Sequence, residues 1–272
     1  MWTEDVFATK KTVIGMIHFP PMPGSPLYDE VGGIGRLVES ARSDLQALQD
    51  GGIDAVMFCN ENDRPYEFKV GPEIVGSMAA VIGQLRSEIR VPFGVDILWD
   101  PVSAIAVAHA TGGTFVREVF TGAYTSDMGV WNTNAGRALR FRKQLGANVK
   151  LLFNVNAEFA SSFDQRPLAS LVKSVVFSSM PDGICVSGPM TGSEVSVDHL
   201  EVVRDAAGQV PIFVNTGVRA ENVREKLLHA DGCIVGTGLK YDGVTWNNVD
   251  AQRVRELMRE VKHFRNGLNI QT

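Results

Sequence analysis

Two hydrophobic patterns alternate along the chain. Short apolar runs rich in β-branched and aromatic residues predict strands near positions 13–18, 55–60, 93–98, 114–120, 149–156, 183–187, 212–215 and 233–236. Between them, apolar residues recur at helical spacing and predict helices near positions 34–49, 73–89, 102–110, 135–145, 167–178, 197–207, 221–229 and 251–264. Parallel strands joined by crossover helices explain this alternation, and eight such strands close a barrel. The expected fold class is α/β, a single (β/α)8 TIM barrel domain over residues 1–272.

The predicted connections differ in length on the two sides of the barrel. Helix-to-strand turns are short and carry glycine, as at Gly51-Gly52 and Gly112-Gly113, where glycine supplies a left-handed helix cap. Several strand-to-helix loops are long, at 19–31, 61–72, 121–133 and 237–249. Because such barrels carry function on these loops, we expect the site at the C-terminal ends of the strands. An open doubly wound sheet is the alternative, but its glycine-rich first turn is replaced here by a proline-rich segment, 19–24.

Composition narrows the class of partner. The chain is 44% hydrophobic and 21% charged, with a formal net charge of −5, which gives no electrostatic reason to expect nucleic acid or an anionic membrane. No stretch approaches the ~20 apolar residues that span a bilayer, and the charged first eleven residues do not resemble a signal peptide. The three cysteines are widely spaced in apolar runs, which predicts buried reduced thiols in a cytoplasmic protein.

Alternation along the strands selects the polar residues that point into the barrel. In segment 149–156 four apolar residues share the side that must meet the helices, so the other side, with Lys150 and Asn154, is expected inside. The same argument places Asp96 inside. In the fourth strand only one of Arg117 and Glu118 can face inward, and the pattern does not choose between them.

Asp96 and Lys150 have two interpretations. They can form a buried ion pair inside the packed barrel, because neither charge is tolerated there alone. Alternatively, Asp96 is a general acid or base with a lysine near it, since burial raises the pKa of a carboxyl and lowers that of an amine. Lys150 comes early in its strand, which disfavours a Schiff base with substrate.

His18 ends the first predicted strand, at the expected rim of the site. A histidine there can be a base, a metal ligand or a hydrogen-bonded rim residue. No His-x-His or His-Glu-x-x-His spacing occurs, so no metal site is predicted, although loop carboxylates can still bind Mg²⁺ together with a phosphorylated ligand. The loop that begins Asn60-Glu61 offers carboxylates, amides and an arginine to a sugar or phosphate, or is a solvated turn.

Glycine-threonine strings follow the last two predicted strands, at Thr216-Gly217 and Gly236-Thr237-Gly238. Loops at these places commonly hold phosphate groups in this fold, because glycine lets backbone N–H groups approach the oxygens. Lys240 adds a charge nearby, and the loop that begins at Ser187 completes the predicted cradle. In the alternative, the glycines serve tight turns only. The chain has no Gly-x-x-x-x-Gly-Lys-Ser/Thr string, so a P-loop nucleotide hydrolase is not supported.

Three stretches resemble the BtpA family. They are the proline-patterned opening at 13–26, the segment 186–192 and the final stretch 230–250. The resemblance covers essentially the whole chain and implies a barrel similar to the ribulose-phosphate-binding group, which includes tryptophan- and histidine-pathway enzymes. It also implies two contexts: cyanobacterial members are linked with photosystem I assembly, and others accompany sugar-uptake genes and carry a nucleoside-triphosphatase label.

The fifth strand departs from the family pattern. The family's fifth strand tends to end in a Lys-His pair, whereas this chain reads Asn154-Val155-Asn156-Ala157-Glu158 in that region. If that pair is catalytic in relatives, this member acts on a different substrate or has lost activity.

The leading hypothesis is an enzyme that moves a proton on a small phosphorylated metabolite, a sugar phosphate, as an isomerase, epimerase or aldolase does. Asp96 is the preferred acid or base, His18 and Glu118 are the alternates, and Lys150 is a further catalytic candidate. The expected substrate-binding residues are Asn60, Glu61, Asn154, Ser187 and Asn215. The alternative is a non-catalytic assembly or regulatory factor, which predicts an exposed apolar patch and no defined polar pocket. A homo-oligomer is expected under either hypothesis.

Overall fold

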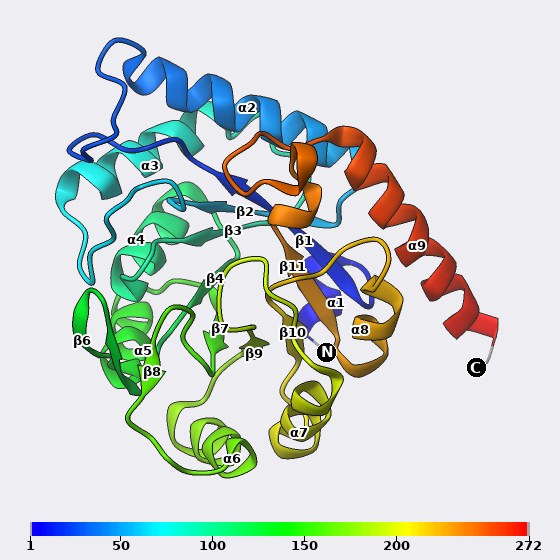
Figure 1. Cartoon of the computed structure of the whole chain (residues 1–272). Coiled ribbons are helices and arrows are strands. Elements are labelled where there is room, and N and C mark those ends of the chain that lie inside the picture. The colour runs from blue at the N-terminus through cyan, green and yellow to red at the C-terminus, as the bar shows by residue number, and fades with distance from the viewer. Residues whose placement is uncertain (1, 271–272) are drawn as a thin grey trace.

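Eight parallel strands form a closed barrel in the computed structural model, which describes residues 2–270 (Figure 1). Around the barrel they follow the order β1-β11-β10-β9-β7-β4-β3-β2, which is also their order along the chain read backwards from β11. The barrel strands are β1 (Thr12–His18), β2 (Ala55–Cys59), β3 (Phe93–Asp96), β4 (Phe115–Glu118), β7 (Lys150–Asn154), β9 (Gly183–Val186), β10 (Ile212–Val214) and β11 (Gly232–Val235). The predicted α/β barrel is confirmed, and each predicted strand corresponds to one of these.

Helices surround the barrel, one after each strand (Figure 1). They are α2 (Gly33–Gly51), α3 (Pro72–Leu85), α4 (Pro101–Thr111), α5 (Ala135–Gln144), α6 (Leu168–Ser179), α7 (Val197–Ala207), α8 (Val223–His229) and α9 (Ala251–Ile270). Local sequence sets several of their ends. The Asp100 carboxylate accepts hydrogen bonds from the N–H groups of Val102 and Ser103 and so caps α4, while Ser196 caps α7. No helix among residues 2–270 is long and apolar enough to cross a membrane.

Strand alternation sorts the core into two layers. Leu151 and Phe153 of β7 pack in the layer between barrel and helices, and Leu152 packs inside the barrel. The predicted orientation of this strand is therefore confirmed. In β4, Phe115 belongs to the inner layer and Val116 to the outer one, so Arg117 continues the inward series. This settles the choice that the sequence pattern left open.

A short N-terminal helix, α1 (Trp2–Phe7), closes the N-terminal end of the barrel. The ring of Phe7 lies 5.4 Å from that of Phe115 and 6.3 Å from that of Phe213. The two inner rings fit because glycines face them: a Cβ on Gly94 would lie 2.2 Å from the Phe115 ring, and one on Gly232 would lie 2.7 Å from Phe213. The sequence analysis did not predict α1, since a six-residue segment is too short to show helical periodicity.

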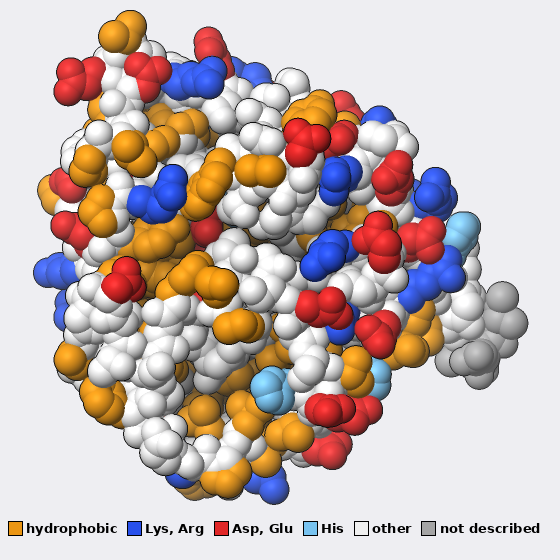
Figure 2. All heavy atoms as spheres, viewed as in Figure 1, with side chains coloured by type: hydrophobic (Ala, Val, Ile, Leu, Met, Phe, Trp, Pro, Cys, Tyr) orange, Lys and Arg blue, Asp and Glu red, His pale blue; other side chains and the backbone are white. Residues whose placement is uncertain are grey.

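The opposite end carries additional structure in the long loops. A three-stranded antiparallel sheet forms from β5 (Ala123–Ser126), β6 (Gly129–Asn132) and β8 (Ser161–Ser162). Its Trp131 packs on Trp99, with ring centroids 5.0 Å apart. Two short 3₁₀ helices, η1 (Thr237–Leu239) and η2 (Tyr241–Gly243), follow β11. On the face shown in Figure 2, acidic and basic side chains intermingle along α9, so no block of one sign covers that helix.

Candidate functional site

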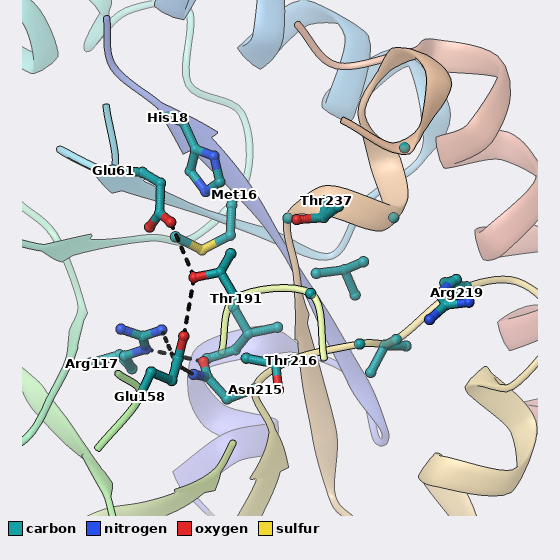
Figure 3. Close-up of a pocket in the computed structure, with 18 of the residues that line it drawn as sticks. Met16, His18, Glu61, Arg117, Glu158, Thr191, Asn215, Thr216, Arg219 and Thr237 are labelled. Carbon is teal, nitrogen blue, oxygen red and sulfur yellow. Dashed lines mark hydrogen bonds and ion pairs between the residues drawn. The ribbon is translucent and has the colours of Figure 1, made fainter. Parts of the chain in front are cut away.

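A pocket opens at the C-terminal end of the barrel, where the sequence analysis expected the site. It contains about 650 Å³ of non-atom space, its open mouth included. Eight predicted site residues line it: His18, Glu61, Asn215, Thr216, Gly217, Gly236, Thr237 and Gly238. The other polar side chains of its lining include Arg117, Glu158, Thr191, Arg219 and Arg253 (Figure 3).

Arg117 is the centre of the hydrogen-bond network at the inner end of this pocket. It extends from β4 into the barrel and is 7% exposed. Its guanidinium donates to Asp96 at 3.0 Å, to the Asn215 side-chain oxygen at 3.0 Å and to Glu158 at 3.4 Å. Burial alone lowers the pKa of Arg117, but the charges of Asp96 and Glu158 raise it above its ordinary value. Arg117 therefore stays charged, and its planar fork fixes the groups around it.

Glu158 joins this network to two neighbouring strands. One of its carboxylate oxygens accepts hydrogen bonds from the Asn215 amide at 2.9 Å and the Ser187 hydroxyl at 3.0 Å. The Asn215 amide also donates to the Ser187 oxygen at 2.8 Å. The structure thus brings together Asn215 and Ser187, both predicted to bind substrate, but their hydrogen bonds are directed at Glu158 and Arg117.

Asp96 and Glu118 form a second pair of carboxyls, behind Arg117 and fully buried. One Glu118 oxygen accepts the Val119 N–H at 2.6 Å, and one Asp96 oxygen faces Arg117. The remaining oxygen of each has no other partner among residues 2–270. Burial raises the pKa of both groups, and the Asp96 charge raises that of Glu118 further. The two buried carboxyls therefore resist being ionised together.

The hydroxyl of Thr191 lies between two more carboxyls. It is 3.2 Å from an oxygen of Glu61 and 3.2 Å from an oxygen of Glu158 (Figure 3). A hydroxyl carries one proton, so both contacts are hydrogen bonds only when one carboxyl is the neutral acid that donates to it. Burial, and then the charge of Glu158, raise the pKa of Glu61 to about 7. Glu61 faces the pocket and therefore takes up and releases its proton near neutral pH. In its ionised form it accepts the hydrogen bond of the Thr191 hydroxyl, which lowers its pKa.

His18 lies beside Glu61 at the end of β1, and its ring borders the pocket near Gly236 (Figure 3). Burial, and then the positive charge of Lys240, lower the pKa of His18 well below its ordinary value. The imidazole is therefore neutral near pH 7. Its Nδ1 has no hydrogen-bond partner in the part of the chain that the structure describes.

The other end of the pocket has the opposite character. The loops after β10 and β11 contribute Gly217, Gly236 and Gly238, which leave backbone uncovered, and the side chains of Arg219 and Arg253. Within residues 2–270, neither guanidinium has a carboxylate within ion-pair distance. The pocket thus has carboxyls at one end and unpaired cations beside glycine backbone at the other.

Two predicted lysines do not reach the pocket. Lys150 begins β7, at the N-terminal end of the barrel, where its ammonium lies 3.9 Å from Asp182 and 5.8 Å from the Trp2 ring. The expected buried pair of Asp96 with Lys150 is therefore not formed, and Arg117 takes that place. The ammonium of Lys240 donates to Asp44 of α2 at 2.7 Å, and both side chains are buried. Lys240 therefore anchors the loop after β11 to α2.

Two predicted amides also lie outside the pocket lining. The Asn60 oxygen accepts the N–H of Leu98 at 2.8 Å, which fixes the loop after β3. Asn154 is fully buried in the barrel, and neither polar atom of its side chain has a partner among residues 2–270. Nor do any three His, Cys, Asp or Glu side chains among these residues form a group that could hold a metal ion.

Comparison with known proteins places this architecture in a family. The model of the BtpA family matches residues 9–263 of the chain. The protein belongs to the BtpA family. It is 47% identical over 265 residues to the sgc region protein SgcQ of Escherichia coli, covering 97% of this chain and 99% of that one. It is 32% identical over 251 residues to the photosystem I biogenesis protein BtpA of Synechocystis, covering 91% and 87%.

Solved structures agree on the barrel. Phosphoribosyl anthranilate isomerase from Thermococcus kodakaraensis aligns with a TM-score of 0.54 at 15% identity, over 93% of this chain and 99% of that one. The 3-hexulose-6-phosphate synthase from Salmonella typhimurium aligns with a TM-score of 0.58 at 13% identity, over 93% and 99%. At these identities the likeness shows the fold alone.

Several residues of this BtpA-family pocket were missed by sequence reasoning. Glu158 lies in the segment after β7 that departs from the family pattern, and this departure was the available signal. Arg117 was considered, but strand alternation alone did not select it. Thr191 lies in the loop that begins at Ser187, which was predicted to complete the phosphate cradle and not to contact carboxyls. Arg219 and Arg253 carried no signal, because loop and helix residues meet at the pocket only through the closed barrel.

Proposed function

We propose that this BtpA-family protein is an enzyme that binds a small phosphorylated sugar and moves a proton on it. The observation that carries the proposal is the division of one pocket into two ends, with Arg219, Arg253 and glycine backbone at one and Glu61, His18 and Arg117 at the other. A sugar phosphate has the matching division, with a dianion at one end and hydroxyl and carbonyl groups at the other.

The cationic end suits a phosphate. Guanidinium groups bind phosphate through paired, charge-assisted hydrogen bonds, and glycine lets backbone N–H groups come close to its oxygens. Arg219 and Arg253 are available for this role because neither has a carboxylate of residues 2–270 within ion-pair distance. Gly217, Gly236, Thr237 and Gly238, predicted from the sequence, lie at the same end, whereas Lys240 is engaged with Asp44.

The carboxyl end suits proton transfer. A base works best when its pKa lies near the working pH, and the pKa of Glu61 is about 7. We assign Glu61 as the acid and base that touches substrate, the neutral His18 as a hydrogen-bond partner for a hydroxyl or carbonyl, and Arg117 as the group that stabilises negative charge developing on oxygen. Asp96, preferred from the sequence, acts behind Arg117 by holding it in place. Isomerisation, epimerisation and aldol cleavage all include such a step.

The first test is ligand binding measured by calorimetry with matched pairs, such as ribose 5-phosphate against ribose and fructose 6-phosphate against fructose. We expect binding by phosphorylated members only, and a loss of about 10–100-fold in affinity for Arg253→Gln, because a charge-assisted hydrogen bond is removed. Arg255→Gln, exposed on the same helix, is the matched control and should bind normally. Equal affinity for free and phosphorylated sugars would refute the phosphate assignment.

The second test addresses the chemistry. With a sugar phosphate that binds, we expect the C–H next to the carbonyl to exchange with deuterium from D₂O, followed by proton NMR. Glu61→Gln should slow exchange by about 10²–10⁴-fold with affinity largely kept, since positioned acid–base catalysis contributes that much. Glu67→Gln, an exposed carboxylate of the same loop, is the control. Exchange at the wild-type rate in Glu61→Gln would remove Glu61 from the mechanism.

The alternative function, a non-catalytic assembly factor, takes its support from the relative named for photosystem I biogenesis. It predicted an exposed apolar patch and no defined polar pocket. The pocket described above favours the enzyme, whereas the exposed Phe177 and Met180 agree with the predicted patch. Purification from the host with a stoichiometric partner, combined with no binding of any phosphorylated compound, would reverse that preference.

A further inference from the structure

The ring of helices around the barrel is closed except at one place. Within residues 2–270, neighbouring helices pack against each other from α6 through α7, α8, α9, α2, α3 and α4 to α5, whereas α5 and α6 do not pack closely. A groove of about 1260 Å³ of non-atom space, its open side included, lies between them. Its lining includes Leu139 and Arg140 of α5, and Ser179 and Met180 at the end of α6.

Large apolar side chains stand in solvent beside this groove. Phe177 on α6 is 89% exposed, and Met180, directly after α6, is 64% exposed. Two large exposed apolar side chains, three residues apart at the end of one helix, form a surface suited to contact with another protein.

Charge on the two flanking helices is opposite in sign. The exposed residues of α5 include Arg137, Arg140 and Lys143, and the helix contains no acidic residue. None of these three has an ion-pair partner within residues 2–270. On the other side of α6, helix α7 exposes Asp198, Glu201 and Asp205, with the partly exposed Val202 among them. The one arginine of α7, Arg204, donates to Asp231 at 2.8 Å, and the helix contains no lysine.

We propose that two copies of this chain associate through α5, α6 and α7, about a two-fold axis that runs parallel to α6. This axis brings the Phe177 rings of the two copies together and lays the acidic α7 of each copy against the basic α5 of the other. A two-fold axis perpendicular to α6 would instead place α5 on α5 and α7 on α7, so like charges would meet. Figure 1 shows α6 at the bottom of the molecule, with α5 to its left and α7 to its right.

The occupant is a second copy because the chain supplies both halves of the contact. The groove needs an acidic surface with apolar residues, and α7 presents one directly beside the same helix, α6. The interface covers the side of the barrel, so the pocket at the C-terminal end stays open in the dimer. This inference is independent of the proposed function.

The test measures mass by sedimentation at about 1–100 µM protein. The wild type should sediment as a dimer of roughly 59 kDa, twice the 29.6 kDa chain, and should dissociate more readily at high salt. Phe177→Ser should weaken the dimer at least 10-fold, whereas Phe163→Ser, an exposed phenylalanine outside this surface, should not. A wild type that is monomeric at 100 µM, or a dimer indifferent to Phe177→Ser, overturns the proposal.

Charge reversal tests the pairing of the helices. One variant carries Glu at Arg137, Arg140 and Lys143, and a second carries Lys at Asp198, Glu201 and Asp205. Each alone should be monomeric, because α5 and α7 then have the same sign, and an equimolar mixture should form a one-to-one dimer. Because all six positions are exposed, circular dichroism should report unchanged folding. Variants that each dimerise alone, or a mixture that stays monomeric, would rule out the α5–α7 pairing.

Discussion

The barrel interior is apolar at its N-terminal end and polar at its C-terminal end. The change from apolar to polar side chains occurs within two residues on each of four strands. Inward positions pass from Phe115 to Arg117 on β4, and from Phe213 to Asn215 at the end of β10. On β3 the step is from Gly94 to Asp96, and on β7 from Leu152 to Asn154. Each strand thus supplies an apolar residue to the closed end and a polar one to the open end.

Within one core, the aromatic layer at the closed end contributes packing, and the charged layer around Arg117 contributes the polar groups of the pocket. Packing between the rings of Phe7, Phe115, Phe213 and Trp2 does not depend on pH, because these side chains carry no titratable group. In the polar layer, Arg117 is surrounded by the carboxyls of Asp96, Glu118 and Glu158, with Glu61 nearby, so protonation decides how well the layer is balanced. Substitutions at the two ends should therefore differ in their pH dependence.

The largest effect is expected at the polar end, for Arg117→Met. Removing the cation leaves Asp96 and Glu158 buried without it, which should cost about 4 kcal/mol of unfolding free energy at pH 8. The cost should shrink at pH 5, because protonation then neutralises the uncompensated carboxylates. Urea denaturation at both values measures it, and an equal loss at both would contradict the charge argument.

At the aromatic end, Phe213→Ala should cost about 3 kcal/mol, because it opens a cavity among Phe7, Trp2 and the barrel wall. The loss should be the same at pH 5 and pH 8, when measured by the same urea titration. A loss that differs between pH 5 and pH 8 would mean that the aromatic layer is coupled to the titrating groups around Arg117.

A smaller effect of opposite sign is expected for Glu61→Gln. The folded protein keeps a proton on Glu61 up to about pH 7, whereas the unfolded chain releases it near the ordinary pKa of 4.5. Stability is therefore unaffected by this group below pH 4.5 and is lost as pH rises from there to about 7. Glu61→Gln should match the wild type at pH 4.5 and be more stable by roughly 2 kcal/mol at pH 8. Thermal unfolding of Glu67→Gln in parallel controls for the change of charge, and no difference at pH 8 would count against a buried ionised Glu61.

The smallest effect is expected for Thr191→Val, which removes the hydroxyl between Glu61 and Glu158. The stability loss should be about 1 kcal/mol, as for one hydrogen bond. Burial and the charge of Glu158 would still raise the pKa of Glu61, while the hydrogen bond that lowers it would be gone. Carbon-13 NMR of labelled glutamate should therefore show Glu61 titrating above its wild-type value, and a downward shift would exclude the described contact.

Sequence patterns predicted the barrel because its strands and helices are long enough to show their periodicity, and alternation correctly placed Asp96 and Asn154 inside. Alternation gives the side of a strand but neither the depth nor the reach of a side chain. Lys150 was recognised as lying early in its strand, yet alternation did not show that its ammonium turns to Asp182 and away from Asp96. Nor did alternation show that Arg117 reaches Asn215 and Glu158. Lys240 follows β11 as the predicted phosphate cradle required, but its ammonium forms an ion pair with the buried Asp44 of α2 and does not reach the pocket.

The short helix α1 determines from which end of the barrel a ligand can enter and leave the pocket. Trp2 and Phe7 pack across the N-terminal end of the barrel, so the pocket is reached from the C-terminal end, where the carboxyls and arginines lie. Under the proposed function, a product must therefore leave by the route along which the next substrate arrives, and the two compete for that route.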